Sequence, residues 1–355
     1  MNLVLTFDYE IYGDGSGDVF THMVHPTKRI LSICEAHDIK ATIYFEVIEY
    51  LKMKEVWNKG IDMGYKEDPI AAIENQIKNA ALAGHDIQLH IHPQWVMAEY
   101  DNGWKVDFDN WRLGDYKGKP GYDLEDLIRE GKEAIEALIR PVVPAYECIA
   151  IRAGGYNVMP SKKVYEAMLN TGLRLDSSVY PGGYESGALS RYDYRDAPLD
   201  KDYWWVKPED FSKEAKDSMI MEIPVFALAQ SRINKFNVER IKSALLNKKS
   251  AINAVKNKTD KMGLSSKIKY FLAKEAFTWD FCLFSSSLHK RFLRYIKRNL
   301  SSRRENFVLI GHPKNFAAEK SFQKFIKTAK NNGAEFQTLK AVYDKFNVPE
   351  MEVFV

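Results

Sequence analysis

Short apolar runs recur along the chain, and most are followed by a segment whose apolar residues have helical spacing. Helical spacing is clearest at 27–37, 69–84, 123–139, 161–172 and 320–333, and the second of these ends in Gly84, a favourable helix terminator. Strand–helix alternation of this kind predicts a parallel sheet or barrel. The predicted strands are Leu3–Phe7, Ala41–Val47, Asp86–Ile91, Cys148–Ala153, Leu173–Ser178, Met219–Val225 and Phe307–His312. Seven such strands indicate an α/β fold of the distorted (β/α)7 barrel type.

Two segments interrupt this alternation. Residues 101–122 are rich in Trp, Gly and Asp, which predicts a long loop or a small hairpin. Residues 231–305 have a mainly helical pattern and contain 19 Lys or Arg against 5 Asp or Glu, whereas the remainder carries 32 against 43. We therefore predict one barrel domain over 1–355, with a basic, mainly helical insertion at 231–305.

The composition is that of a soluble globular protein. Of the 355 residues, 45% are apolar and 28% are charged, and the net charge of +3 gives no indication of a nucleic-acid partner. Cys34, Cys148 and Cys282 are far apart and odd in number, which argues against a disulfide framework. The first residues do not resemble a signal peptide, and no apolar stretch is long enough to span a bilayer, so we expect a cytoplasmic protein.

Polar residues end most of the predicted strands. In barrels of parallel strands, catalytic residues come from the carboxyl ends of several strands, so these side chains are expected to share one rim. These strand-end residues are three acids, three histidines and an arginine. In chain order they are Asp8, Glu10, His90, His92, Arg152, Asp176 and His312.

The sequence His90-Ile91-His92 places two imidazoles on the same face of an extended strand. This geometry would allow both to bind one ion. Taken alone, the pair does not establish a metal site, and catalytic bases or ordinary strand residues remain as alternatives, because a site also needs a carboxylate, a base and an acid.

Five separated motifs, in order, resemble those of the NodB-homology polysaccharide deacetylases (carbohydrate esterase family four). They are "LTFDYE" (5–10), "GHDIQLHIHP" (84–93), "IRAGGYN" (151–157), "LRLDSSV" (173–179) and "LIGHPKN" (309–315). The segment "CEAHDIKATIYFEV" (34–47) is also similar to the family's helix-then-strand signature. The resemblance spans Leu3 to about Asn315, and its specificity lies in the ordered set rather than in any single motif.

The chain departs from the family pattern at two places. The family's second acid normally follows the first directly, but here Tyr9 intervenes and Glu10 comes next, like a D-x-E version of the D-x-D found in some branches. The spacer between the two motif histidines is shortened, so that His92-Pro93 takes the place of the second His-Pro.

The resemblance implies a metal site made of Glu10, His90 and His92. Three protein ligands leave positions open for water and substrate, and such a set accepts a divalent ion, with Zn²⁺ as the first candidate. Gln94 is a weaker substitute ligand. The alternatives are a solvated strand-end acid for Glu10 and a loop histidine held by Pro93 for His92.

The resemblance also implies catalytic roles. Asp8 would be the base, kept ionised by Arg152, although the two could instead form a structural salt bridge. The backbone N–H of Tyr156 would donate to the oxyanion, and His312 would protonate the leaving amine. Asp176 would orient His312, or would alternatively cap the strand end together with Ser177 and Ser178.

The implied function is metal-dependent removal of an N-acetyl group from an amino sugar, by hydrolysis of a linear C–N amide bond. A cytoplasmic enzyme would meet a nucleotide- or lipid-phosphate-linked sugar rather than an extracellular polymer. Two alternatives remain open. One is a deformylase, cyclic-amide hydrolase or other amide hydrolase of the same superfamily, and the other is a non-catalytic barrel that binds carbohydrate or phosphate.

The insertion contains two segments that combine cations with aromatic residues at helical spacing, "KIKYFLAK" (267–274) and "LHKRFLRYIKRNL" (288–300). Three uses are compatible with this pattern: a solvated helical lid, a surface that contacts anionic membranes from the cytoplasmic side, and a site for the phosphate of an activated sugar.

Overall fold

The computed structural model describes residues 1–235, 237–246 and 272–346. Its centre is a sheet of parallel strands in the order β12-β7-β6-β3-β2-β1-β15. Each of the seven predicted apolar runs contributes one of these strands, which confirms the predicted α/β class. Their bounds are β1 (Asn2–Tyr9), β2 (Thr42–Glu46), β3 (Asp86–Ile91), β6 (Ala150–Ala153), β7 (Leu175–Asp176), β12 (Met221–Glu222) and β15 (Asn306–Leu309).

The sheet curls toward closure. Val225, just after β12, forms an isolated bridge with Val308 of β15, and the N–H of Phe226 donates to the Val308 carbonyl at 2.8 Å. Beyond β12 the sheet continues with the antiparallel strands β10 (Trp204–Lys207) and β11 (Asp210–Glu214). The barrel is therefore distorted, because its last junction is a bridge rather than a full strand pairing.

Strand β1 is paired along its whole length by segments from both ends of the chain. Its first half pairs with β15 on one side and with β16 (Glu335–Gln337) on the other. Its second half, from Thr6 to Tyr9, pairs with β2. The apolar side chains of β1, β2 and β15 are fully buried, so the core runs along β1 to its carboxyl end.

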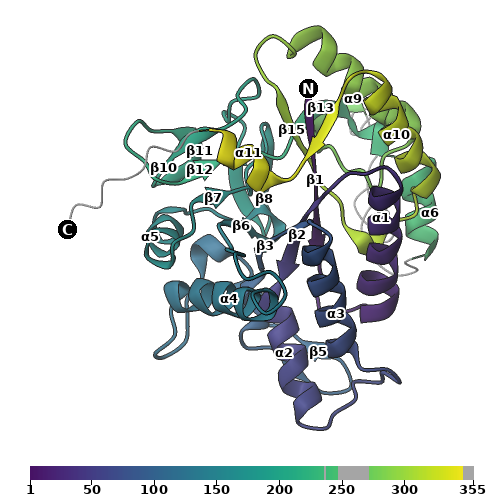
Figure 1. Cartoon of the computed structure of the whole chain (residues 1–355). Coiled ribbons are helices and arrows are strands. Elements are labelled where there is room, and N and C mark those ends of the chain that lie inside the picture. The colour runs from purple at the N-terminus through teal and green to yellow at the C-terminus, as the bar shows by residue number, and fades with distance from the viewer. Residues whose placement is uncertain (236, 247–271, 347–355) are drawn as a thin grey trace, which may run out of the picture.

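Helices surround the curled sheet, as Figure 1 shows. The five helical patterns in the sequence correspond to α1 (His25–Ala36), α3 (Pro69–Leu82), α4 (Leu124–Ile139), α5 (Lys162–Thr171) and α10 (Glu319–Asn331). Two further helices, α2 (Val47–Asn58) and α11 (Leu339–Lys345), were not predicted. Local chemistry fixes several ends: Asp123 and Asp126 form a capping box on α4, and Gly172 ends α5 with a left-handed φ of 79°.

The predicted loop at 101–122 adjoins a small hairpin of β4 (Glu99–Tyr100) and β5 (Trp104–Lys105). Two 3₁₀ turns follow, η3 (Phe108–Asn110) and η4 (Leu113–Asp115). A second hairpin of β8 (Gly183–Ser186) and β9 (Arg191–Tyr194) lies between β7 and β10.

The described part of the basic segment contains α6 (Val238–Leu246) and α9 (Ser286–Asn299), in line with its helical pattern, after a short 3₁₀ turn, η6 (Arg232–Lys235). It also contains β14 (Lys274–Thr278), which pairs antiparallel with β13 (Ala227–Ser231). This strand was not predicted, because the segment was expected to be mainly helical. Most of "KIKYFLAK" lies outside the described residues. None of the helices in the described ranges has both the length and the apolar composition that a membrane crossing requires.

Candidate active site

The carboxyl ends of β1, β3 and β6 bring most of the predicted residues to one rim. Asp8 is in β1, and His90 is paired in register with Arg152 of β6. On its other side, His90 is paired with Glu46, the last residue of β2. Because neighbouring strands are parallel and in register here, residues that are far apart in the sequence end at the same height.

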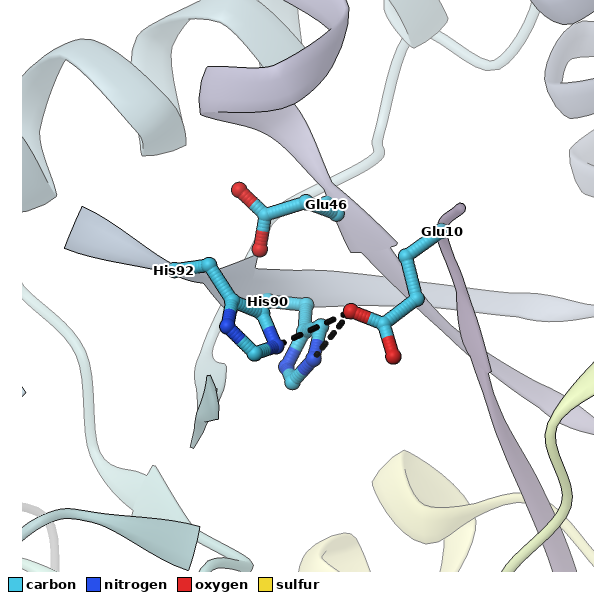
Figure 2. Close-up of side chains that lie close together, drawn as sticks. All are labelled: Glu10, Glu46, His90 and His92. Atoms are coloured by element: carbon cyan, nitrogen blue, oxygen red, sulfur yellow. Dashed lines mark ion pairs between the residues drawn. The ribbon is translucent and has the colours of Figure 1, made fainter. Parts of the chain in front are cut away.

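The predicted metal ligands lie together. Glu10 Oε2 is 2.9 Å from His92 Nε2 and 3.5 Å from His90 Nε2. Glu46 belongs to the same group, because the ligand atoms of all four residues lie within 4.8 Å of one another (Figure 2). We refer to Glu10, Glu46, His90 and His92 as the metal cluster. Glu46 was not predicted; it is the last residue of β2, although the predicted strand ended one residue later at Val47.

The chemistry of His90 fits a metal ligand. Its Nδ1 lies 2.8 Å from the Arg152 carbonyl, so Nδ1–H donates there and Nε2 keeps its lone pair. Within the described ranges, this buried Nε2 has no hydrogen-bond partner. An orphaned buried acceptor beside carboxylate oxygens is the arrangement that a divalent transition metal would satisfy.

The tautomer of His92 is set by Gln94. The Gln94 amide nitrogen lies 2.9 Å from His92 Nδ1 and donates to the Gly13 carbonyl at 3.2 Å. In this arrangement His92 Nδ1 accepts and Nε2–H faces Glu10. Binding of a metal through Nε2 requires the amide of Gln94 to turn and present its oxygen, which has no partner among the described residues. Gln94, predicted as a substitute ligand, thus contacts a ligand instead.

A glycine determines where the His92 ring lies. A Cβ placed on Gly154 would be 2.5 Å from the ring atoms of His92, far inside contact distance. The close packing of the chain after β6 against His92 therefore requires glycine at this position.

Asp8 and Arg152 form the predicted pair. Arg152 Nη1 donates to Asp8 Oδ1 at 2.8 Å, and Nε of the same guanidinium donates to the Ser177 carbonyl at 2.9 Å. Burial alone would raise the pKa of Asp8, but the charges of Arg152, His90 and His312 outweigh burial and lower it. Asp8 is therefore ionised and able to accept a proton.

His312 lies on the other side of Asp8, with its Nε2 3.5 Å from Asp8 Oδ2. Its Nδ1 is 3.6 Å from Asp280 Oδ2. Burial lowers the pKa of His312, but the carboxylates of Asp280 and Asp8 more than compensate, so its pKa is raised. Asp280 follows β14 and was not predicted, because it stands outside any regular strand and joins the sheet only through a bridge to Ile310.

Asp176 is placed elsewhere. Its carboxylate accepts from the Ser178 hydroxyl at 2.7 Å and from the Ser178 N–H at 3.0 Å, and it lies against Glu222 of the neighbouring β12. The expected contact between Asp176 and His312 is not formed within the described structure, since the carboxylates beside His312 are Asp8 and Asp280. The strand-end capping alternative describes the Asp176 contacts better.

Tyr156 ends the short turn η5 (Gly154–Tyr156) after β6. It has a φ of +64°, uncommon for a bulky residue, and follows Gly155 at +56°. Its carbonyl accepts from the Tyr194 hydroxyl at 2.6 Å. Such a conformation persists only where the surroundings impose it, and here it brings the backbone to the site.

These elements enclose a cavity of about 290 Å³. Lys314, at one wall, donates to Glu10 Oε1 at 2.7 Å and to the Ile11 carbonyl at 2.8 Å. Trp111, from the loop before α4, lies 6.0 Å from the His92 ring and stacks on Phe108. The cavity is lined by Asp8, Glu10, Gly13, His92, Trp111, Ala153, Gly155, Tyr156, Asp280, Leu283, His312, Lys314 and Asn315.

Neither a family model nor a curated protein matches this chain. Solved structures match it over nearly its whole length, and polysaccharide deacetylases, the kind of protein that the motifs resemble, are among them.

Three of these structures illustrate the degree of likeness. PuuE allantoinase has 13% identity and a TM-score of 0.48, with 98% of this chain and 91% of that chain covered. A Mycobacterium smegmatis protein described as a polysaccharide deacetylase has 13% identity and a TM-score of 0.47, with 97% and 89% covered. A family 4 acetyl xylan esterase from Clostridium thermocellum, in complex with a cobalt ion, has 14% identity and a TM-score of 0.37, with 98% and 93% covered. Likenesses of this degree carry no argument about function, which rests on the site itself.

Proposed function

We propose that this protein is a metal-dependent hydrolase that removes an N-acetyl group from an amino sugar by cleaving a linear C–N amide bond. One observation carries the proposal: Asp8, held by Arg152, lies between the metal cluster and His312, and the cavity opens onto all three. A base, an electrophile-binding site and an acid around one cavity are the three parts that amide hydrolysis needs.

The metal would be held by Glu10, His90 and His92, with Zn²⁺ as the first candidate. A divalent ion bound there supplies Lewis acidity toward the amide carbonyl and lowers the pKa of a bound water. Asp8 accepts the proton of the attacking water, and Arg152 keeps Asp8 ionised and correctly oriented.

Departure of the amine requires a proton, because an amide anion is a very poor leaving group. His312 donates that proton, and Asp280 favours its protonated form. The backbone N–H of Tyr156 donates to the oxygen that becomes negative as the carbonyl is attacked, at the turn that lines the cavity.

The size of the cavity supports a small acylated group at the reacting end. At about 290 Å³ it lies at the lower limit of the roughly 300–1,000 Å³ typical of ligand sites, which suits one acylated sugar unit. The leaving group would then extend out of the cavity, where a nucleotide or a lipid phosphate could follow the sugar.

The basic helix α9 bears on that extension. It exposes Lys290, Arg291, Arg294, Lys297 and Arg298. Its 14 residues span about 21 Å. The helix begins shortly after Asp280, which lies at the rim, and ends shortly before β15. The first residue of β15 pairs with the start of β1, at the other end of the barrel. The later cations thus lie toward the end of the barrel opposite to the rim. Because these cations lie away from the rim, contact with an anionic membrane surface explains that half of the helix better than binding of the substrate's phosphate does.

Acetate release from a panel of N-acetylated amino sugars, free and phosphate-linked, tests the proposed function. The protein is first freed of metal and then reloaded with Zn²⁺, and the Asp8→Asn variant serves as the inactive control. Metal-dependent release by the wild type alone is the expected result. Binding of the sugars without turnover, with any metal, would favour the non-catalytic barrel.

A further inference from the structure

Glu46 has an environment that the three predicted ligands do not explain. It is fully buried at the end of β2, beside His90 in the sheet register. One carboxylate oxygen caps α2 by accepting from the Glu49 N–H at 3.4 Å. The other oxygen, Oε2, has no hydrogen-bond partner in the part of the chain that the structure describes.

An unpaired buried carboxylate oxygen is costly, and buried acids are generally paired or bound to a metal. Burial raises the pKa of Glu46, and the negative charges of Glu49 and Glu10 raise it further, whereas the backbone N–H groups of Glu49 and His92 act in the opposite direction. The nearby cation Lys314 is bound to Glu10 Oε1 and to the Ile11 carbonyl. The remaining open acceptor in the same cluster is His90 Nε2, which is likewise without a hydrogen-bond partner in the described ranges.

We propose that Glu46 is a fourth ligand of the ion held by Glu10, His90 and His92, so that the site has two carboxylates and two imidazoles. This inference rests on the metal site of the proposed function. Glu10 would bind through Oε2, since Lys314 holds Oε1. The cavity reaches Glu10 and His92 but is not lined by His90 or Glu46. His90 and Glu46 would therefore approach the ion from the buried side, and Glu10 and His92 from the side of the cavity.

A second carboxylate changes which ions the site accepts. Imidazoles suit zinc and other late transition metals, whereas carboxylates also suit harder ions such as Mn²⁺. The charge of two carboxylates balances that of one divalent ion. Glu46 should therefore strengthen binding of all divalent transition metals and should matter most for Mn²⁺.

The test uses the full chain freed of metal and titrated with Co²⁺, whose visible absorption reports the ligands around the ion. Glu46→Gln keeps the shape of the side chain and removes its charge. We expect Co²⁺ affinity to fall more than 100-fold, beyond the 10–100-fold typical of changes to groups that only touch a ligand, with an altered spectrum. Mn²⁺ affinity should fall by more than Zn²⁺ affinity.

Glu49→Gln is the matched control. Glu49 is one turn further along, is 1% exposed, and accepts from the Ile11 N–H rather than joining the cluster. We expect its Co²⁺ affinity to stay within about tenfold of the wild type, with the same spectrum. If Glu46→Gln does not fold, Glu46→Asp takes its place, since it keeps a carboxylate at shorter reach and should bind Co²⁺ with a changed spectrum.

An unchanged Co²⁺ spectrum in the Glu46 variant, whatever its affinity, would overturn the inference, because the ion would then not touch this side chain. His90→Ala separates this failure from failure of the proposed function. If His90→Ala loses the ion and the Glu46 variant keeps the wild-type Co²⁺ spectrum, only the role of Glu46 as a ligand is refuted. If His90→Ala binds the ion fully, the metal site itself is refuted.

Discussion

Two groups of buried acids sit at strand ends in this barrel and differ in what surrounds them. The metal cluster brings Glu10 and Glu46 together with two imidazoles, at the ends of β1, β2 and β3. The second group, which we call the acid pair, is Asp176 of β7 and Glu222 of β12, paired in register and fully buried.

The acid pair takes most of its hydrogen bonds from the backbone and from serine. Ser178 donates twice to Asp176, and the Val179 N–H donates to Glu222 at 3.2 Å. Burial raises the pKa of both acids. The pKa of Glu222 lies well above its usual range, because the charge of Asp176 adds to the effect of burial. The raised pKa of Glu222 favours its protonated form, and we expect that proton to be shared with the adjoining Asp176 carboxylate. Two acids at a strand end do not make a metal site. The imidazoles and the adjoining cavity distinguish the metal cluster.

The largest expected effect comes from Asp8→Asn. The amide cannot accept the proton of the attacking water, so turnover should fall by about 10²–10⁴-fold or more while metal content stays that of the wild type. Turnover and metal content are measured on the same preparation. If the variant loses the metal, Asp8 belongs among the ligands and the division between base and metal cluster is wrong.

Gly154→Ala tests how tightly the metal cluster is positioned. The new Cβ would overlap the His92 ring, so the ring must shift and metal affinity should fall by about 10–100-fold. Competition with a metal chelator measures this loss. Gly187→Ala, in the turn between β8 and β9, is the matched control, because φ is not positive at either glycine and a Cβ added at Gly187 would come no closer than 3.4 Å to another atom. Equal affinity for wild type and Gly154→Ala would show that His92 is not bound to the ion.

Asp280→Asn and Asp176→Asn compare the two candidates for orienting His312. Asp280 raises the pKa of His312, so its removal should lower that pKa. The general acid would then lose its proton at lower pH, and the alkaline limb of the kcat profile should move to lower pH, with kcat near neutrality falling about tenfold. Asp176→Asn should leave this limb in place. A shift in the Asp176 variant, and none in the Asp280 variant, would restore the role that the sequence motif implied.

The smallest effect is expected for Glu222→Gln, and it concerns stability. The pKa of Glu222 is raised in the folded state, so its contribution to stability is fully present below the unfolded pKa of about 4.3 and is lost as pH rises above that value. Each unit of raised pKa is worth about 1.4 kcal/mol. Gln donates to Asp176 without taking up a proton, so the variant should gain stability relative to the wild type between pH 5 and 8. Denaturant unfolding at several pH values measures this difference, and parallel curves for the two proteins would contradict the shared proton.

The strands were predictable because apolar runs in a parallel barrel are buried on both faces, and the bounds of β3 agree residue for residue. Asp8, Glu10, His90, His92, Arg152 and His312 came together because the rule that strand ends share a rim is geometric. The positions of other site residues depend on tertiary contacts, which the spacing of apolar residues does not predict. Asp280 lies in a segment predicted to be mainly helical, and Asp176 accepts from the nearby Ser178 hydroxyl instead of contacting His312. The same rule applies to Glu46, which is the last residue of β2.

The pairing of β1 also has a consequence for the order of events during synthesis. Leu3 and Val4 lie between Phe307 and Val308 on one side and Phe336 and Gln337 on the other. Closing a loop of this length costs chain entropy that only the completed pairing recovers. A chain still emerging from the ribosome can pair β1 with β2, but the other edge of β1 stays open until residues beyond 306 are exposed. Asp8 is then anchored on one side alone, because its N–H donates to the Gly311 carbonyl at 3.0 Å in the folded protein. Maturation of the base thus waits for the last 50 of the 355 residues to be translated.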